Sequence, residues 1–303
     1  MASRELQLAI ELCRFSRRKR RPTVVELGGL AELRARYDDI ADSHPLPDDV
    51  SYEVVDAGGV SAEWVSGPWC RDDCVILYLH GGCYATGSVE THRDLITRLS
   101  IAAATRVLGL NYRLAPAHPF PAAVEDTVAA YRWLLDRGIE PARLALVGDS
   151  AGAGLALAAT ITLRDAGTPI PGAIACLSPW VDLAVTGDSM RTRAGEDPIV
   201  SREMLLAWGK LYLGDHDPRT PLASPLYADL HGIPPTLIQA GSAEVLLDDA
   251  TRLAERAAAA GVETALEVWP EMIHVWHTFA PILPEARDAI TRIGTFVRSH
   301  LDS

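Results

Sequence analysis

Short apolar runs recur along the chain from Cys74 to Pro270, and several are separated by segments of helical periodicity. Apolar residues recur at helical spacing in 124–138 and in 248–261. Continuous apolar strands that alternate with helices are typical of a parallel sheet covered on both faces. The pattern therefore predicts an α/β fold with a mostly parallel central sheet. The strand-like runs are "VILYLH" (75–80), "RVLGLNY" (106–112), "LALVG" (144–148), "AIACLSPW" (173–180), "TLIQAG" (236–241) and "ALEVWP" (265–270).

The segment 51–67 has a different pattern, in which apolar and polar residues alternate. Gly58 and Gly59 lie within it and favour a tight turn between two strands. We expect an antiparallel hairpin here, at the edge of the sheet.

Residues 1–45 do not follow the alternation of strands and helices. Their pattern is helical, with Leu6, Ile10 and Cys13 at helical spacing. Glu5, Gln7 and Glu11 interrupt the apolar positions, so neither a signal peptide nor a membrane span fits.

Residues 183–225 also interrupt the alternation of strands and helices. Ser201 is expected to cap a helix, and the helix carries an apolar stripe of Met204, Trp208, Leu211 and Tyr212. The stripe either covers a binding cleft as a lid or packs into the core, and the pattern alone leaves both interpretations open.

Composition and charge indicate a globular protein and argue against several classes of partner. The 303 residues are 48% hydrophobic and 22% charged, which is ordinary for a globular chain. A net charge of −12 argues against a nucleic-acid partner, because phosphate binding needs a basic surface. The one basic run, Arg17–Arg21, is interpreted as a solvated helix end rather than a targeting or lipid-binding patch. The five cysteines contain no CxxC pair, so we expect a reduced, cytoplasmic protein without a cysteine-bound zinc.

The stretch "GDSAG" (148–152) places Ser150 between a strand and a helix. Glycines on both sides permit a sharp turn, and the hydroxyl then projects at the carboxyl edge of the sheet, where ligands bind in open α/β sheets. The alternative is a tight turn that happens to contain serine. The strand, turn and helix context favours a nucleophile.

A serine nucleophile needs backbone donors for the oxyanion that forms on the substrate. The stretch "HGGCY" (80–84) follows a strand directly, and Gly81 and Gly82 let its N–H groups turn toward the serine. Ala151, directly after the nucleophile, is expected to supply a third N–H. His80 is expected to hold this loop by hydrogen bonds rather than to act as a base.

The base is expected late in the chain, after the last strand. His274 and His277 follow the run that ends near Pro270, and His274 lies where the loop passes over the serine. His277 is expected in the following helix, packed or solvated. Their spacing also suggests a metal pair, but no nearby carboxylate or cysteine completes such a site.

Several carboxylates are candidates for the acid that orients the histidine. Glu244 lies nearest the end of the strand 236–241, whereas Asp248 and Asp249 suit the first turn of the next helix. Asp182 follows an earlier strand and would serve the same chemistry.

Together these motifs resemble the hormone-sensitive-lipase-like family of α/β-hydrolases, the microbial esterases of its GDSAG branch. The resemblance covers about residues 50–300 and rests on five stretches in family order. It implies an α/β-hydrolase fold with a helical cap, and division into an N-terminal cap segment (1–45), a core (46–182 and 226–303) and a second cap segment (183–225). The stretches are "YLHGGCYATGS", "NYRLAPAHPFPAAVED", "LVGDSAG", "LSPWVDL" and "WPEMIHVW".

Carried over by position, the resemblance assigns Ser150 as nucleophile, His274 as base and Glu244 as acid, with Asp248 as the substitute. The family usually has aspartate at the acid position, so glutamate is a departure by one methylene. A second departure is Cys83, where many relatives have glycine. The family's oxyanion donors are the backbone N–H groups at Gly82 and Cys83, and the cysteine side chain is expected to narrow the pocket.

The sequence thus predicts a cytoplasmic carboxylic-ester hydrolase. The resemblance implies a small ester substrate with a short- to medium-chain acyl group, and it implies no cofactor. Other hypotheses are a non-catalytic ligand receptor on the same scaffold, an amidase, a deacetylase or a lipase. A homodimer is compatible with the architecture.

Overall fold

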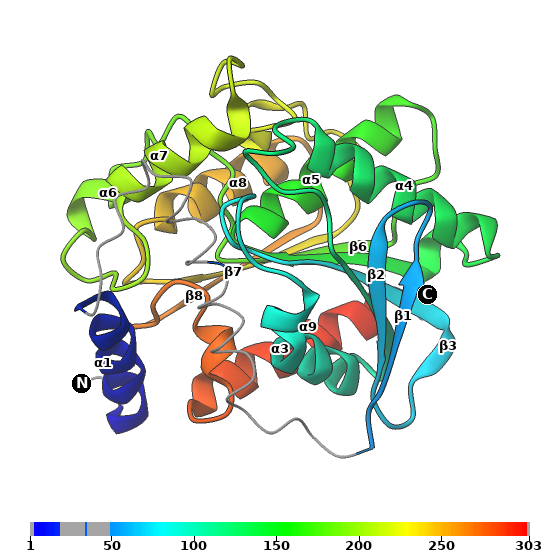
Figure 1. Cartoon of the computed structure of the whole chain (residues 1–303), viewed down its shortest axis with the longest axis horizontal. Helices are drawn as coiled ribbons and strands as arrows, with labels where there is room; N and C mark the ends of the chain where they lie inside the picture. Colours follow the sequence, from blue (N-terminus) through cyan, green and yellow to red (C-terminus); the bar gives the residue numbers. More distant parts are fainter. Residues whose placement is uncertain (1–2, 19–33, 35–48, 302–303) are drawn as a thin grey trace.

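The computed structural model of the chain describes residues 3–18, 34 and 49–301, which form an α/β fold around one eight-stranded sheet (Figure 1). The strand order is β1-β2-β4-β3-β5-β6-β7-β8. Strand β2 pairs antiparallel with β1 and β4, and every other pairing is parallel. The strands are β1 (Ser51–Asp56), β2 (Ser61–Ser66), β3 (Arg71–Leu79), β4 (Thr105–Leu110), β5 (Leu144–Asp149), β6 (Ala173–Leu177), β7 (Thr236–Gly241) and β8 (Thr264–Trp269).

This topology confirms the predicted mostly parallel sheet and the hairpin at its edge. One strand is shorter than its apolar run indicated. The run 173–180 leaves the sheet after Leu177, because Ser178 has a positive φ of 46° that no extended strand accommodates.

Helices cover both faces of the sheet, because alternate residues of each central strand point to opposite sides. Leu77 and Leu79 belong to one apolar cluster, and Ile76 and Tyr78 belong to the other. The helices are α1 (Arg4–Arg18), α3 (Val89–Ala103), α4 (Ala122–Asp136), α5 (Ala151–Asp165), α6 (Ser189–Thr192), α7 (Arg202–Leu213), α8 (Leu247–Ala259) and α9 (Pro284–Leu301), with 3₁₀ turns η1 (Pro141–Arg143), η2 (Pro225–Tyr227) and η3 (Trp276–Phe279).

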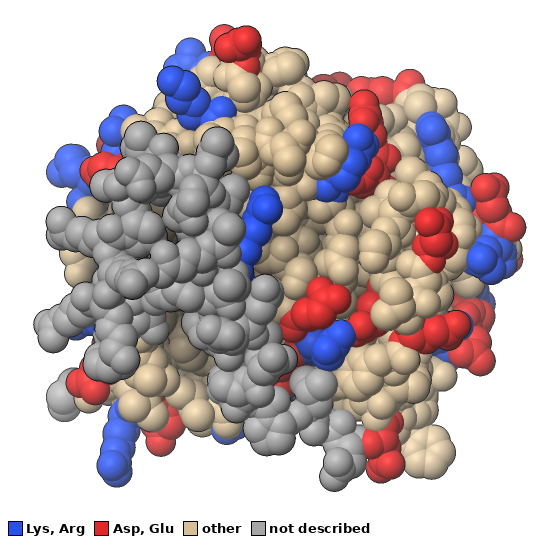
Figure 2. Space-filling view, viewed as in Figure 1, with Lys and Arg blue, Asp and Glu red and all other residues tan. Residues whose placement is uncertain are grey.

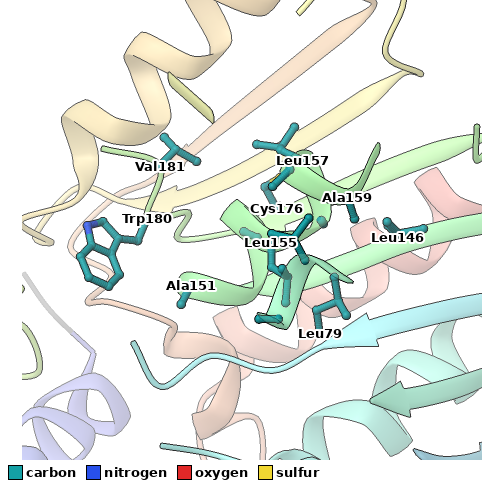
Figure 3. Packing of buried hydrophobic residues seen from close by; sticks show 14 of the residues in the cluster. Leu79, Leu146, Ala151, Leu155, Leu157, Ala159, Cys176, Trp180 and Val181 are labelled. Carbon is teal, nitrogen blue, oxygen red and sulfur yellow. The ribbon is translucent and has the colours of Figure 1, made fainter. Parts of the chain in front are cut away.

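The first cluster joins the sheet to α4, α5, α7 and α8, and the second joins it to α1, α3 and α9. Figure 3 shows the first cluster, in which Leu155 and Leu157 of α5 lie beside Leu79, Leu146 and Cys176 of the strands. Helix α5 is buried along nearly its whole length, so it forms a rigid base for the turn that precedes it.

Ser201 caps α7 as expected, since its side chain accepts a hydrogen bond from the Met204 amide. In the stripe that follows, Trp208 and Tyr212 are buried, and Met204 and Leu211 pack against the first cluster. Core packing therefore describes this stripe. Tyr212 also stacks on Tyr84 of the 80–84 loop, with ring centroids 3.8 Å apart.

The N-terminal prediction is confirmed for α1, where Leu6 is buried and Ile10 and Cys13 pack against the second cluster. The remainder of the proposed segment 1–45, apart from Arg34, lies outside the described residues, as do the side chains of the basic run at 17–21. Arg34 donates to the carbonyls of Ala85 and Ala115.

Within the part of the chain that the structure describes, no helix combines the length and apolarity needed to cross a bilayer. On the face shown in Figure 2, basic and acidic side chains of the described residues are interspersed.

Candidate active site

Ser150 occupies a strained turn between β5 and α5. Its φ of 53° and ψ of −117° lie outside the regions that residues with a side chain ordinarily adopt. Two backbone hydrogen bonds from neighbouring segments hold the turn: the Ser150 amide donates to the Leu177 carbonyl, and the Trp180 amide donates to the Ser150 carbonyl. Gly152 is required here, because a Cβ at that position would overlap the Leu79 carbonyl. The turn thus presents the serine hydroxyl at the carboxyl ends of the strands.

His274 lies between Ser150 and Glu244. Its Nε2 is 3.0 Å from Ser150 Oγ, and its Nδ1 is 2.8 Å from Glu244 Oε2. The other oxygen of Glu244 accepts the Gly241 amide at 2.7 Å, which holds the carboxylate at the end of β7. All three side chains are buried. The parallel sheet explains the meeting of residues so far apart in sequence, because β5, β7 and β8 end at the same edge.

The electrostatic surroundings of His274 favour its protonated form. Burial alone lowers the pKa of the imidazole. The hydrogen bond and negative charge of Glu244, with a smaller effect of Asp197, outweigh burial and raise the pKa of His274 above 6.5. An imidazole so placed can take a proton from the serine and keep it as an ion pair with Glu244.

The other predicted acid candidates have different partners. Asp182 pairs with Arg252 at 3.2 Å. Asp249 accepts two backbone amides, and Asp248 accepts one from the segment that follows β6. Among the described residues, none of these bonds leads to His274.

His277 does not join the site. It lies in η3, fully buried, and its Nε2 is 2.8 Å from Gln239 Oε1. Burial lowers the pKa of His277 to about 3, so the imidazole is neutral and packs inside the protein.

The 80–84 loop requires one correction to the predicted oxyanion donors. The Gly81 amide donates to Asp149 Oδ1 at 2.9 Å and is not free for a substrate. The amides of Gly82, Cys83 and Ala151 donate to no acceptor among the described residues. Gly82 has a φ of 109°, and a Cβ there would overlap the Thr86 carbonyl. Three amides near Ser150 thus remain available for an oxyanion.

Asp149 is a site residue that sequence reasoning missed. Besides Gly81 it accepts the Tyr78 hydroxyl at 2.5 Å, and it lies 3.5 Å from His92 Nε2. Burial raises the pKa of Asp149, but the charge and hydrogen bond of His92, together with the Tyr78 hydroxyl, outweigh it and lower the pKa to about 2. The signal in the sequence was a carboxylate inside an otherwise apolar strand end, next to the nucleophile.

His80 has the structural role expected of it. Its ring stacks on Tyr112 at 4.2 Å, and its Nδ1 is 2.7 Å from the Gly81 carbonyl. Burial lowers the pKa of His80 to about 4. The neutral ring therefore stabilises the loop through its hydrogen bond to the Gly81 carbonyl and its stacking on Tyr112.

Cys83 is buried and has a φ of 56°. Burial raises the pKa of its thiol to about 12, so the group is protonated at neutral pH. The side chain behaves as a small apolar group within the first cluster.

Comparisons with known proteins agree with this geometry. Residues 76–278 match the family described as having the alpha/beta hydrolase fold. The chain is 48% identical over 299 residues to an acetyl-hydrolase of Streptomyces hygroscopicus, covering 99% of this chain and 98% of the relative. It is 36% identical over 273 residues to a putative acetyl-hydrolase, LipR, of Mycobacterium tuberculosis, covering 90% of this chain and 88% of the relative.

Solved structures show the same relationship. An esterase from the bacterial hormone-sensitive lipase family superposes with a TM-score of 0.95 at 52% identity, with 99% of each chain covered. The esterase EstE5 superposes with a TM-score of 0.94 at 45% identity over the whole of both chains. The chain therefore belongs to the α/β-hydrolase family, within the bacterial hormone-sensitive-lipase group that its motifs resemble.

Proposed function

We propose that this protein is a carboxylic-ester hydrolase in which Ser150, His274 and Glu244 act as nucleophile, base and acid. The observation that carries the proposal is the unbroken series of hydrogen bonds from Ser150 Oγ through His274 to Glu244, at a strained turn beside three unpaired amides. The names of the relatives, which include acetyl-hydrolases and esterases, support the same reaction class.

In the acylation step, Ser150 Oγ attacks the ester carbonyl while His274 Nε2 takes the hydroxyl proton. The carbonyl oxygen becomes an oxyanion, which accepts hydrogen bonds from the amides of Gly82, Cys83 and Ala151. His274 then gives its proton to the alkoxide, which leaves as the alcohol. The acyl group stays on Ser150 as an ester.

In the deacylation step, water replaces the alcohol. His274 takes a proton from water as its oxygen attacks the acyl-enzyme, and the same amides hold the second oxyanion. Collapse of this intermediate breaks the bond to Ser150 Oγ, and His274 returns the proton to the serine. Glu244 remains ionised and orients the imidazole in both steps.

The proposed substrates are small esters of short- to medium-chain acids, with acetyl esters foremost. The printed names of two relatives support acetyl groups. Cytoplasmic location and a homodimer stay predictions.

The test is hydrolysis of p-nitrophenyl esters of rising acyl-chain length by the wild type and Ser150→Ala. We expect a p-nitrophenol burst followed by turnover, fastest on short chains, and loss of both in the variant. A folded Ser150→Ala protein with wild-type turnover would overturn the assignment. A wild type that binds esters without hydrolysing them would identify a receptor instead.

A further inference from the structure

A second buried carboxylate lies on residues 189–200, which contact the chain just after Glu244 and are called the crossing segment below. Asp197, in the loop between α6 and α7, is 5% exposed. Its Oδ1 accepts the amides of Ile199 and Val200 at 2.8 and 2.9 Å, and its Oδ2 accepts the amide of Val245 at 3.0 Å. Asp197 takes no direct part in the proton transfers between Ser150, His274 and the substrate.

The contact with Val245 matters because Val245 directly follows Glu244. Ser189, on the same crossing segment, donates its hydroxyl to the Val245 carbonyl at 2.6 Å. Its amide donates to Asp248 Oδ2 at 2.9 Å. The crossing segment therefore holds the loop after Glu244 at both ends, and Asp197 makes the bond adjacent to the acid.

The charged groups that face His274 come from several elements. Glu244 bonds its Nδ1, Asp197 contributes from the crossing segment, and Asp149 contributes from the end of β5. His277 in η3 also faces it but is neutral at working pH, since burial lowers its pKa to about 3. Asp149 lies 3.5 Å from His92 Nε2, so part of its charge is balanced when that imidazole is protonated. Asp197 has no cation within ion-pair distance among the described residues, and its oxygens accept three backbone amides.

We propose that Asp197 is a positioning residue for the reaction, which fixes the loop that carries Glu244 and adds a second negative charge to the surroundings of His274. The inference rests on the proposed function, because it assigns a role in the same proton transfers. Asp197 touches neither the substrate nor the reacting atoms. It acts through the Val245 amide and through the field at the imidazole.

The direct consequence is a change in the proton affinity of His274. The charge of Asp197 favours the imidazolium, so its removal should lower the pH at which His274 titrates. A charge that interacts with an ionisable group across a protein interior shifts the pKa of that group by about half a unit or more. In Asp197→Asn the side-chain NH2 group would also face the Val245 N–H. Both groups are donors, so this hydrogen bond would be lost and the chain after Glu244 would be held less firmly.

The experiment follows the downfield proton on His274 Nδ1 by NMR across pH, in the wild type, Asp197→Asn and Asp248→Asn. His274→Gln identifies the resonance by removing it. Asp248→Asn is the matched control, because it also removes a carboxylate that bonds the crossing segment to the chain after Glu244, while Asp248 is not among the main charges that act on His274.

We expect the titration midpoint to fall by about half a unit or more in Asp197→Asn and to stay within about 0.2 unit of the wild type in Asp248→Asn. The acid limb of kcat/KM on p-nitrophenyl acetate should shift by the same amount, and kcat should fall about tenfold. Equal midpoints in wild type and Asp197→Asn, or equal shifts in both variants, would overturn the inference.

Asp197→Ser provides a second way to remove the charge if Asp197→Asn does not fold. Its hydroxyl can still accept an amide of its own turn, and the same lowered midpoint is expected. The NMR titration requires no turnover, so it is independent of the proposed function. Absence of esterase activity in the wild type would refute the function, whereas an unchanged midpoint in an active enzyme would refute only the role of Asp197.

Discussion

The Gly81 amide donates a hydrogen bond of 2.9 Å to Asp149 Oδ1, and this bond ties the oxyanion loop to the strand that ends at the nucleophile. Gly81 lies just after the end of β3, and Asp149 ends the neighbouring parallel strand β5, so the two residues lie side by side. Ser150 follows Asp149 and Gly82 follows Gly81. The bond therefore sets the distance between the attacking hydroxyl and the amides that must receive the oxyanion.

Removal of the Asp149 carboxylate should consequently affect stability and turnover together. Asp149→Ala leaves the Tyr78 hydroxyl, the Gly81 amide and His92 without their acceptor. We expect a loss of about 3 kcal/mol of unfolding free energy in urea and a fall in kcat of about tenfold or more. Asp149→Asn keeps one oxygen for Gly81 and should lose less kcat. Equal kcat in the two variants would show that the bond does not position the loop.

The activity of the wild type should depend on pH through His274. The imidazole must be neutral to accept the serine proton, and its pKa is raised above 6.5. Activity is therefore expected to fall as the pH drops through a midpoint above 6.5, and a kcat/KM profile on p-nitrophenyl acetate measures it. An acid limb below 6.5 would contradict the electrostatic account.

Substitution of Glu244 tests whether this residue is the acid of the site and whether the length of its side chain matters. Glu244→Gln removes the charge that stabilises the imidazolium, so kcat should fall about a thousandfold or more. Glu244→Asp restores the residue usual in the family, but on this backbone it lengthens the bond to His274, and we expect intermediate activity. Asp248→Ala, measured alongside, should keep near-wild-type kcat. A larger loss in Asp248→Ala than in Glu244→Gln would reverse the assignment.

The stack of Tyr212 on Tyr84 should stabilise the folded protein through the packing of the two rings and not through the Tyr212 hydroxyl. That hydroxyl is buried and finds no partner among the described residues. Tyr212→Phe should therefore leave the thermal midpoint unchanged or slightly raised. Tyr212→Ala removes the ring from the core and should cost about 3 to 4 kcal/mol. Similar losses in both variants would mean that the hydroxyl has a bonding role.

Cys83 should resist alkylation despite its place beside the nucleophile. Its thiol is buried, and its pKa of about 12 leaves almost no thiolate at pH 8. Iodoacetamide is expected to leave activity intact, while peptide mass spectrometry finds Cys83 unmodified in the native protein and modified after unfolding. Inactivation that tracks alkylation of Cys83 would contradict this.

Much of the candidate site could be predicted from sequence because each part is local. The turn at Ser150 needs its flanking glycines, and the strand before it is a continuous apolar run. His274 was placed by the same logic, whereas Glu244 was one of several carboxylates near strand ends until the family resemblance selected it. The carboxylates that hold these parts in place were not predicted. Asp149 and Asp197 are single carboxylates whose partners lie 68 and 48 residues away.

The sequence by itself determined the class of sheet, the edge hairpin, the nucleophile turn and the order of the candidate groups. These follow from apolar periodicity and from backbone conformations that only certain residues permit. Only the tertiary structure decided which carboxylate bonds His274, that Gly81 is engaged by Asp149, and that the stripe on α7 is core. A hydrogen bond depends on distance and direction between atoms, and those are set when the strands take their order in the sheet.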